Sequence, residues 1–256
     1  MSLRSLLTAL AICAALPGAA QDVWVLGEIH DNPAHHAEQA DQVEKLQPAA
    51  IVFEMLTADQ AARVTPDLRD DEDALAAAID WDAGGWPDFS MYHPIFTAAP
   101  GAEIFGALVP RAKARAVFDK GLVSAFDGDA ARYGLDEDLP EDRQAARESL
   151  QMEAHCNALP EDMLPGMVAV QRLRDAVLAR AVVRAMDATG GPVAVITGNG
   201  HARRDWGMPA ILSRVAPDLD IWVLGQTEAD QPLEGDFDIV KSAPAPDRPD
   251  PCAAFQ

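Results

Sequence analysis

The chain has 256 residues, of which 49% are hydrophobic and 24% are charged, and its formal net charge is −21. This length and balance are typical of a globular protein with one large domain or two small ones. Because so acidic a surface repels polyanions, we exclude nucleic-acid binding and electrostatic docking on anionic lipid.

Residues 1–20 have the pattern of a signal peptide. Arg4 supplies a basic start, residues 6–16 form an apolar run too short to span a bilayer, and residues 18–20 are small, as at a cleavage site. A buried N-terminal helix is the alternative. We therefore expect the protein to be exported, to the periplasm or beyond, and to be soluble after cleavage.

The remainder, residues 21–256, is expected to form a single α/β domain. The bulky residue before Cys13 is unlike a lipidation signal, so we expect no lipid anchor, and no other apolar stretch is long enough for a transmembrane segment. Cleavage leaves Cys156 and Cys252, an even pair in an oxidising compartment. The pair predicts a disulfide between the C-terminal tail and the body of the domain, and two free thiols are the alternative.

Strand and helix patterns alternate along the domain. Buried strands are expected at 23–26, 50–55, 103–109, 193–197, 221–225 and, more weakly, 237–240. Helices are expected at 33–46, 58–64, 70–79, 110–118, 141–154, 161–186 and 205–215. Residues 80–100 form an aromatic, turn-rich patch with little periodicity, and residues 119–140 are expected to be loop. This order predicts an α/β fold, a mainly parallel sheet flanked by helices, with helical insertions.

Polar side chains follow three of the predicted strands. Glu28 and His30 come after the first strand, where Gly27 is expected to end it, Glu54 closes the second, and His201 follows the strand at 193–197. Because parallel strands end at one edge of a sheet, these side chains can converge. Such a cluster can bind a divalent metal ion or transfer protons in hydrolysis. The alternative is that each is a turn residue or a helix cap.

Five motifs give the chain a family resemblance. They are Gly-Glu-Ile-His-Asp-Asn-Pro-Ala-His-His at 27–36, Phe-Glu-Met at 53–55, His-Cys at 155–156, Gln-Arg-Leu-Arg-Asp at 171–175 and Gly-Asn-Gly-His-Ala-Arg-Arg-Asp-Trp-Gly-Met-Pro at 198–209. In this order they resemble the ChaN-like haem-binding proteins, which are grouped with TraB, Tiki and erythromycin-esterase proteins. The resemblance runs from about residue 23 to residue 240. It implies an exported α/β protein, often a lipoprotein, linked to haem binding and iron uptake.

Six side chains outside the strand ends have the chemistry of a haem site. Imidazole and phenolate ligate haem iron, and arginine pairs with the propionates. The set consists of His35, His36, Tyr92, His93, Arg203 and Arg204. We expect haem to be held by this set, beside or apart from the strand-end cluster, and a homodimer to form around it. Surface histidines, a core tyrosine and solvated arginines are the alternatives.

Two functions therefore stay open. The first is an exported haem-binding protein linked to haem or iron uptake or handling. The second is a hydrolase of the wider superfamily, in which Glu28, His30, Glu54 and His201 act through a bound divalent metal ion or as Glu–His pairs.

Overall fold

The computed structural model describes residues 21–250 and 252–253, so the predicted signal peptide lies outside the described residues. Six strands form one sheet in the order β3-β2-β4-β1-β5-β6. Every neighbouring pair is parallel, which confirms the predicted sheet type. The strands are β1 Val23–Glu28, β2 Ala50–Phe53, β3 Glu103–Gly106, β4 Val193–Gly198, β5 Ile221–Glu228 and β6 Ile239–Ala243.

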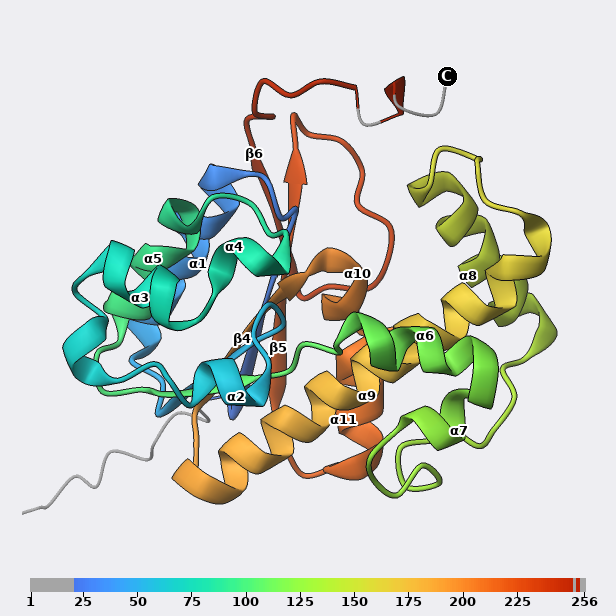
Figure 1. The fold of residues 1–256 in the computed structure, drawn as a ribbon, viewed down its shortest axis with the longest axis horizontal. Helices are drawn as coiled ribbons and strands as arrows, with labels where there is room; N and C mark the ends of the chain where they lie inside the picture. The colour runs from blue at the N-terminus through green and yellow to red at the C-terminus, as the bar shows by residue number, and fades with distance from the viewer. Residues whose placement is uncertain (1–20, 251, 254–256) are drawn as a thin grey trace, which may run out of the picture.

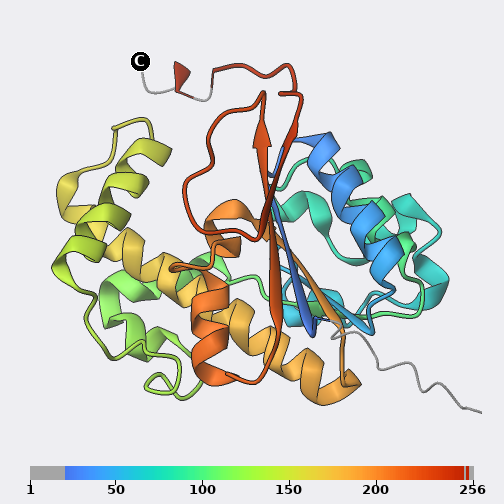
Figure 2. The same cartoon turned by 180° about the vertical axis from the view of Figure 1, so that it is seen from behind.

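Helices cover both faces of the sheet, as Figures 1 and 2 show from opposite sides. One face carries α1 Pro33–Leu46, α3 Glu72–Ala78, α4 Trp81–Gly84 and α5 Phe89–Ala98. The other carries α6 Arg111–Lys120, α7 Leu122–Ala125, α8 Glu141–Ala154, α9 Leu164–Thr189 and α11 Met208–Val215. Two short helices, α2 Ala58–Ala61 and α10 Asn199–Ala202, follow β2 and β4, and 3₁₀ turns lie at Pro66–Leu68 and Glu161–Met163.

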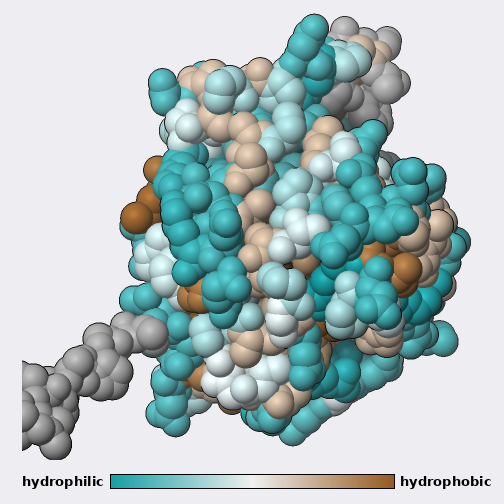
Figure 3. Space-filling model, turned by 90° about the vertical axis from the view of Figure 1, so that its left-hand side faces the viewer, coloured by the Kyte–Doolittle hydropathy of each residue, from teal (hydrophilic) through white to brown (hydrophobic). Residues whose placement is uncertain are grey.

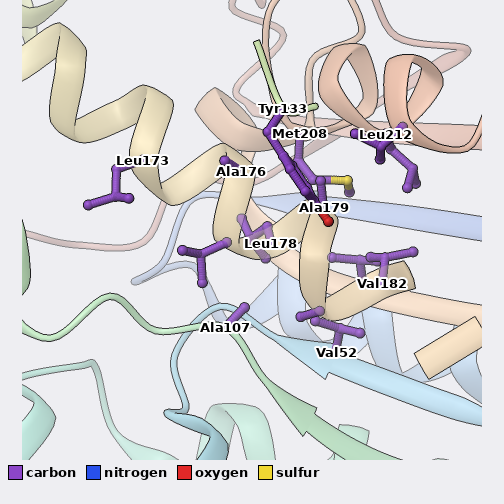
Figure 4. Close-up of a cluster of buried hydrophobic side chains, with 14 of the residues drawn as sticks. Val52, Ala107, Tyr133, Leu173, Ala176, Leu178, Ala179, Val182, Met208 and Leu212 are labelled. Carbon is purple, nitrogen blue, oxygen red and sulfur yellow. The ribbon is translucent and has the colours of Figure 1, made fainter. Parts of the chain in front are cut away.

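The central strands β1, β2 and β4 are almost entirely apolar because both faces of the sheet are buried there. Val52 packs into the core cluster beneath α9, with Leu178 and Val182 of that helix (Figure 4). Its neighbour Phe53 points to the opposite cluster and stacks on Phe96, with ring centroids 4.3 Å apart. The alternation of side chains along a strand thus divides the apolar residues between two cores.

The aromatic patch at residues 80–100 is helical, so the prediction of an irregular segment was wrong. Asp88 caps α5 by accepting a hydrogen bond from the Ser90 backbone N–H at 2.9 Å. Phe89, Tyr92 and Phe96 then lie on the buried side of α5 at helical spacing. The turn residues, including a proline inside the helix, hid this periodicity.

Several boundaries also differ from prediction. β1 continues through Gly27 to Glu28, because Gly27 is needed for close packing rather than for a turn: an added Cβ would lie 2.6 Å from Asn199 Oδ1. The short helices α7 and α10 lie where loop was expected, and the helix predicted at 205–215 begins at Met208. Neither short helix was predicted, because a segment of four residues shows too little hydrophobic periodicity.

The C-terminal tail crosses the molecule from β6 towards the far end of α8 (Figure 1). Arg248 forms ion pairs with Glu228 at the end of β5 and with Asp31. Cys252 is joined to Cys156, two residues past α8, in the disulfide that the cysteine pair predicted. The surface in Figure 3 is largely hydrophilic. Over the part of the chain that the structure describes, no helix is both long and apolar enough to cross a membrane.

Candidate functional site

The four polar residues that follow the strands lie at one edge of the sheet. Glu28 is the last residue of β1, Glu54 directly follows β2, and His201 lies in α10, immediately after β4. Together with His30 they line one cavity of about 1140 Å³. The structure therefore brings together the residues that the strand-end argument grouped, while their chemical role stays a prediction.

Glu28 is the centre of a buried hydrogen-bond network. One carboxylate oxygen accepts the Tyr92 hydroxyl at 2.8 Å and lies 2.7 Å from His30 Nδ1, and the other lies 3.3 Å from His36 Nδ1. Burial alone would raise the pKa of this carboxyl group, but the two histidines outweigh burial and lower the pKa to about 2. Glu28 is therefore an anion whose partners are supplied by the turn after β1 and by α1 and α5.

His36 has acceptors at both ring nitrogens. Nδ1 lies 3.1 Å from Gln39 Oε1, and Nε2 lies 2.8 Å from the carbonyl oxygen of His30. The Gln39 amide nitrogen donates to the carbonyl of Leu26, which fixes its oxygen towards the imidazole. Both nitrogens of His36 must then carry hydrogen, as in an imidazolium ion. Burial lowers the pKa of His36, but the Glu28 carboxylate outweighs this and raises it.

His35 is neutral, because one of its ring nitrogens accepts a hydrogen bond and so carries no hydrogen. Its Nδ1 accepts the backbone N–H of Ile29 at 3.0 Å, so only Nε2 can carry hydrogen, and Nε2 lies 3.2 Å from the carbonyl of Thr227. Burial lowers its pKa. Both His35 and His36 are 0% exposed. They hold the turn after β1 in place, and neither presents a free nitrogen to the cavity.

His30 is the imidazole that the cavity can reach. Its Nδ1 is bound to Glu28, its Nε2 makes no hydrogen bond with a described residue, and its side chain is 36% exposed. An added Cβ on Gly198 would lie 3.1 Å from Nε2, so glycine there lets the ring approach β4 closely. Burial lowers the pKa of His30, but the bond to Glu28 and the charge of Glu54 raise it to about 9. Trp86 lies edge-on, with ring centroids 5.0 Å apart.

A second imidazole faces Glu54 from the other side. His201 Nδ1 lies 2.7 Å from Asp175 Oδ1, and its Nε2 is 3.7 Å from Glu54 Oε1. The other oxygen of Glu54 accepts the Thr197 hydroxyl and the Gly198 N–H. Burial opposes charge on all three groups, but the carboxylates raise the pKa of His201, and its charge together with that of His30 lowers the pKa of Glu54. For Asp175, burial dominates and raises the pKa.

The remaining haem candidates are engaged elsewhere in the protein. Tyr92 is 0% exposed, and burial, reinforced by the charge of Glu28, raises the pKa of its phenol. His93 Nε2 lies 2.7 Å from the carbonyl of Arg69, and His93 does not line the cavity. Arg203 and Arg204 form ion pairs with Asp205 and Asp238. Haem contacts by these side chains stay predictions that require the present bonds to open.

The strand-end cluster does not fit a single metal ion in this arrangement. Within residues 21–250 and 252–253, no three His, Cys, Asp or Glu side chains are placed to hold one. One oxygen of Glu28 is already bound to Tyr92 and His30, and one oxygen of Glu54 to Thr197 and Gly198.

Asp175 and the helical side of the cavity were not predicted as site residues, although Gln171, Arg174 and Asp175 belong to the motif at 171–175. Asp175 is buried in α9, at heptad spacing between the buried residues Val168 and Val182. A single acid at a core position of an otherwise apolar helix face was a second signal. Trp86 and Trp206 also line the cavity, as do polar side chains of α8, which carried no recognisable pattern.

Comparison with known proteins shows the family of this chain. A family model described as haem-binding uptake, Tiki superfamily, ChaN matches residues 17–212. The chain belongs to this family. A ChaN of Campylobacter jejuni, whose structure is described as cofacial heme binding, shares the fold with a TM-score of 0.65 at 17% identity, over 84% of this chain and 85% of that one.

Two other solved structures match this chain with lower TM-scores. The type III effector HopBA1 matches with a TM-score of 0.45 at 12% identity, over 88% of each chain. The erythromycin esterase EreC matches with a TM-score of 0.43 at 15% identity, over 81% of this chain and 70% of that one. Among proteins with curated functions, none matches the chain.

Proposed function

We propose that this protein binds haem in the cavity at the sheet edge and acts in haem or iron handling after export. Membership of the haem-binding ChaN family supports the ligand. The observation that carries the placement is His30, whose Nε2 lines the cavity without a protein partner beside the ring of Trp86. Imidazole is a common ligand of haem iron once its nitrogen has lost its proton, so His30, whose pKa is raised to about 9, would release the Nε2 proton when it binds. A mostly apolar cavity suits the porphyrin.

The residues behind His30 would tune the ligand. Glu28 holds Nδ1, which fixes the ring and makes Nε2 more basic, as hydrogen-bonded carboxylates do for metal-bound histidines. Tyr92 reaches the same carboxylate from the other side. Bound haem would supply the iron chemistry, and these side chains would orient and polarise one imidazole.

A haemin titration followed by absorbance tests this proposal. Wild type and His155→Ala, a histidine outside the cavity lining, are expected to give the same Soret band and affinity. His30→Ala is expected to lose the band or shift it with at least about tenfold weaker binding. If His30→Ala keeps the wild-type band and Tyr92→Phe loses it, the iron is held by the phenol and the Glu28 network opens. If no protein binds haemin, the proposal fails.

Export and dimer formation belong to the same proposal. The disulfide between Cys156 and Cys252 supports an oxidising compartment, since such bonds seldom persist in the cytosol. The cofacial heme binding described for Campylobacter jejuni ChaN supports asking whether haem joins two copies of this chain. The expected result is a mature protein that begins near Gln21 and doubles its mass when haemin is added, as measured by light scattering.

A hydrolase is the second candidate, and the Asp175–His201 contact of 2.7 Å favours it. The carboxylate holds His201 with Nε2 towards the cavity, so a neutral His201 can take a proton from an attacking water. Because the Glu54 and Asp175 carboxylates raise the pKa of His201 and so favour its protonated form, hydrolysis would increase as pH rises and the proton is lost. Hydrolysis of activated esters by wild type, Asp175→Asn and His201→Gln tests this. Equal rates in the three proteins would eliminate the hydrolase.

A further inference from the structure

The helical side of the cavity has a polar surface of its own. Arg147 and Gln151 lie one turn apart on α8, and Gln171 and Arg174 lie one turn apart on α9. Residues at these spacings share a helix face, and all four side chains line the cavity. We call these four residues the helical wall. They face a space that also contains His30, Glu54 and His201.

Arg147 lacks the counter-ion that most buried guanidinium groups have. Its one hydrogen bond, from Nη2 to the carbonyl oxygen of Trp206, is long at 3.4 Å, and its Nε is buried with no partner. Burial lowers its pKa to about 10, and the charge of Asp175 opposes this shift only in part. Its guanidinium carbon lies 5.2 Å from the centroid of the Trp206 ring. Arg203, by contrast, is bound in a fork to Asp205. A half-buried guanidinium group with no ion pair to break is available to an anion that enters the cavity.

Two neighbours of Arg147 are also unsatisfied. Gln151 is only 7% exposed, yet its amide oxygen has no partner, although most buried polar groups do. Arg174 also lines the cavity and makes no hydrogen bond or ion pair with any described residue. The wall thus offers two guanidinium groups to a missing acceptor.

The rest of the cavity limits what that acceptor can belong to. Apolar side chains, including Leu108, Val109, Leu150, Val168 and Leu178, line the space between the wall and the strand ends. A small inorganic anion would leave this surface and most of the 1140 Å³ unfilled. The fitting ligand has a large apolar body with a carboxylate on one side, for which the planar guanidinium is the matching donor.

We propose that the helical wall binds the carboxylates of such a ligand, which are the propionates when the ligand is haem. This rests on the proposed haem function. It assigns the propionates to Arg147 and Arg174 in place of Arg203 and Arg204, whose guanidinium groups are already bound to Asp205 and Asp238. The ligand then spans the cavity, with its metal centre at His30 and its acidic edge at α8 and α9.

Haemin and its dimethyl ester separate this proposal from haem binding itself, because the ester keeps the porphyrin and iron but has no carboxylate charge. Wild type is expected to bind haemin about tenfold to 100-fold more tightly than the ester, as charged hydrogen bonds imply. Arg147→Gln and Arg174→Gln are expected to lose that preference by weakening haemin alone. Arg143→Gln, on the same helix but outside the cavity lining, is the matched control.

The outcomes are distinct. If both ligands bind and neither Arg147→Gln nor Arg174→Gln changes their ratio, the wall does not bind carboxylates, although the haem function stands. Equal weakening of haemin and ester in these variants would mean lost packing and would also overturn the assignment. Failure of both ligands to bind wild type overturns the haem function together with it. Circular dichroism melting of each variant shows that the comparison is made on folded protein.

Discussion

The two sides of the cavity solve the problem of burying charge in opposite ways. At the strand ends, Glu28 has two histidines of raised pKa beside it, so the protein itself supplies the opposite charge, although its second oxygen makes no hydrogen bond. On the helical wall, Arg147 forms no ion pair with a described carboxylate. The difference indicates that the strand-end charges are balanced within the protein, whereas the wall has charge left for a ligand.

The largest loss of stability is expected when the carboxylate at the strand ends is removed. Glu28→Ala removes the carboxylate from a buried imidazolium and a buried phenol, so the free energy of unfolding should fall by about 3–5 kcal/mol. Urea denaturation measures this. Asp41→Ala, which removes an exposed carboxylate paired with Lys45, should leave the midpoint unchanged. A loss from Glu28→Ala no larger than that of the control would show that the network contributes little to stability.

Removing the disulfide should weaken the packing of α8 more than that of the strands. Replacing Cys156 and Cys252 by alanine opens a loop with a sequence separation of 96 residues and should lower the free energy of unfolding by about 3 kcal/mol. Because Cys156 lies two residues past α8, backbone amides of α8 should exchange hydrogen faster by a larger factor than those of β1 and β4, which open only when the whole domain unfolds. A uniform acceleration over helix and strands would show that the tail supports the whole domain equally.

The strand-end network also predicts how stability varies with pH. The pKa of Glu28 falls from 4.5 to about 2 on folding, so its contribution is complete above 4.5 and is lost as pH falls towards 2. The pKa of His30 rises from 6.5 to about 9, so its contribution is complete below 6.5 and is lost as pH rises towards 9. Melting temperatures should therefore be highest between these ranges.

His30→Ala is expected to flatten the alkaline decline more than the acidic one. Because His36 also has a raised pKa, part of the alkaline decline should remain. A pH profile unchanged by His30→Ala would separate that histidine from the stability network and leave Glu28 paired with His36 alone.

The smallest loss of stability is expected where the C-terminal tail contacts the end of β5 and the turn after β1. Arg248→Ala removes ion pairs to Asp31 and Glu228, which are partly exposed, so the free energy of unfolding should fall by no more than about 1 kcal/mol. Haemin affinity should not change, because Arg248 does not line the cavity. A large loss of haemin binding would mean that the tail positions the turn carrying His30.

The strand ends were predictable because two simple rules decide them. Apolar runs without alternation indicate strands buried on both faces, and parallel strands place their carboxyl ends together. Applied to the amino-acid sequence alone, these rules group Glu28, His30, Glu54 and His201. They say nothing about side-chain direction, so they could not show that one oxygen of Glu28 is already bound to Tyr92 and His30.

The other residues depend on tertiary packing that no local pattern encodes. His35 and His36 resemble exposed helix residues in sequence, but the turn after β1 folds back over them and uses their ring nitrogens. The helical wall escaped notice because Arg147 and Gln151 belong to a helix rich in charge, where most such side chains face water. Only the position of α8 beside the sheet edge distinguishes them from the others.

The strand order has a consequence for how the chain folds. β1 and β2 are consecutive in sequence, yet they are not neighbours: β4, which begins at Val193, lies between them and pairs with both. The edges of β1 and β2 that face each other thus have no partner until a strand about three-quarters of the way along the chain is available. Contacts so distant in sequence are slow to form, because the long intervening loop must close first. A fragment that stops before Val193 lacks β4 and β5, so both edges of β1 and one edge of β2 would be unpaired, and residues 21–192 form a segment prone to aggregation until those strands pair.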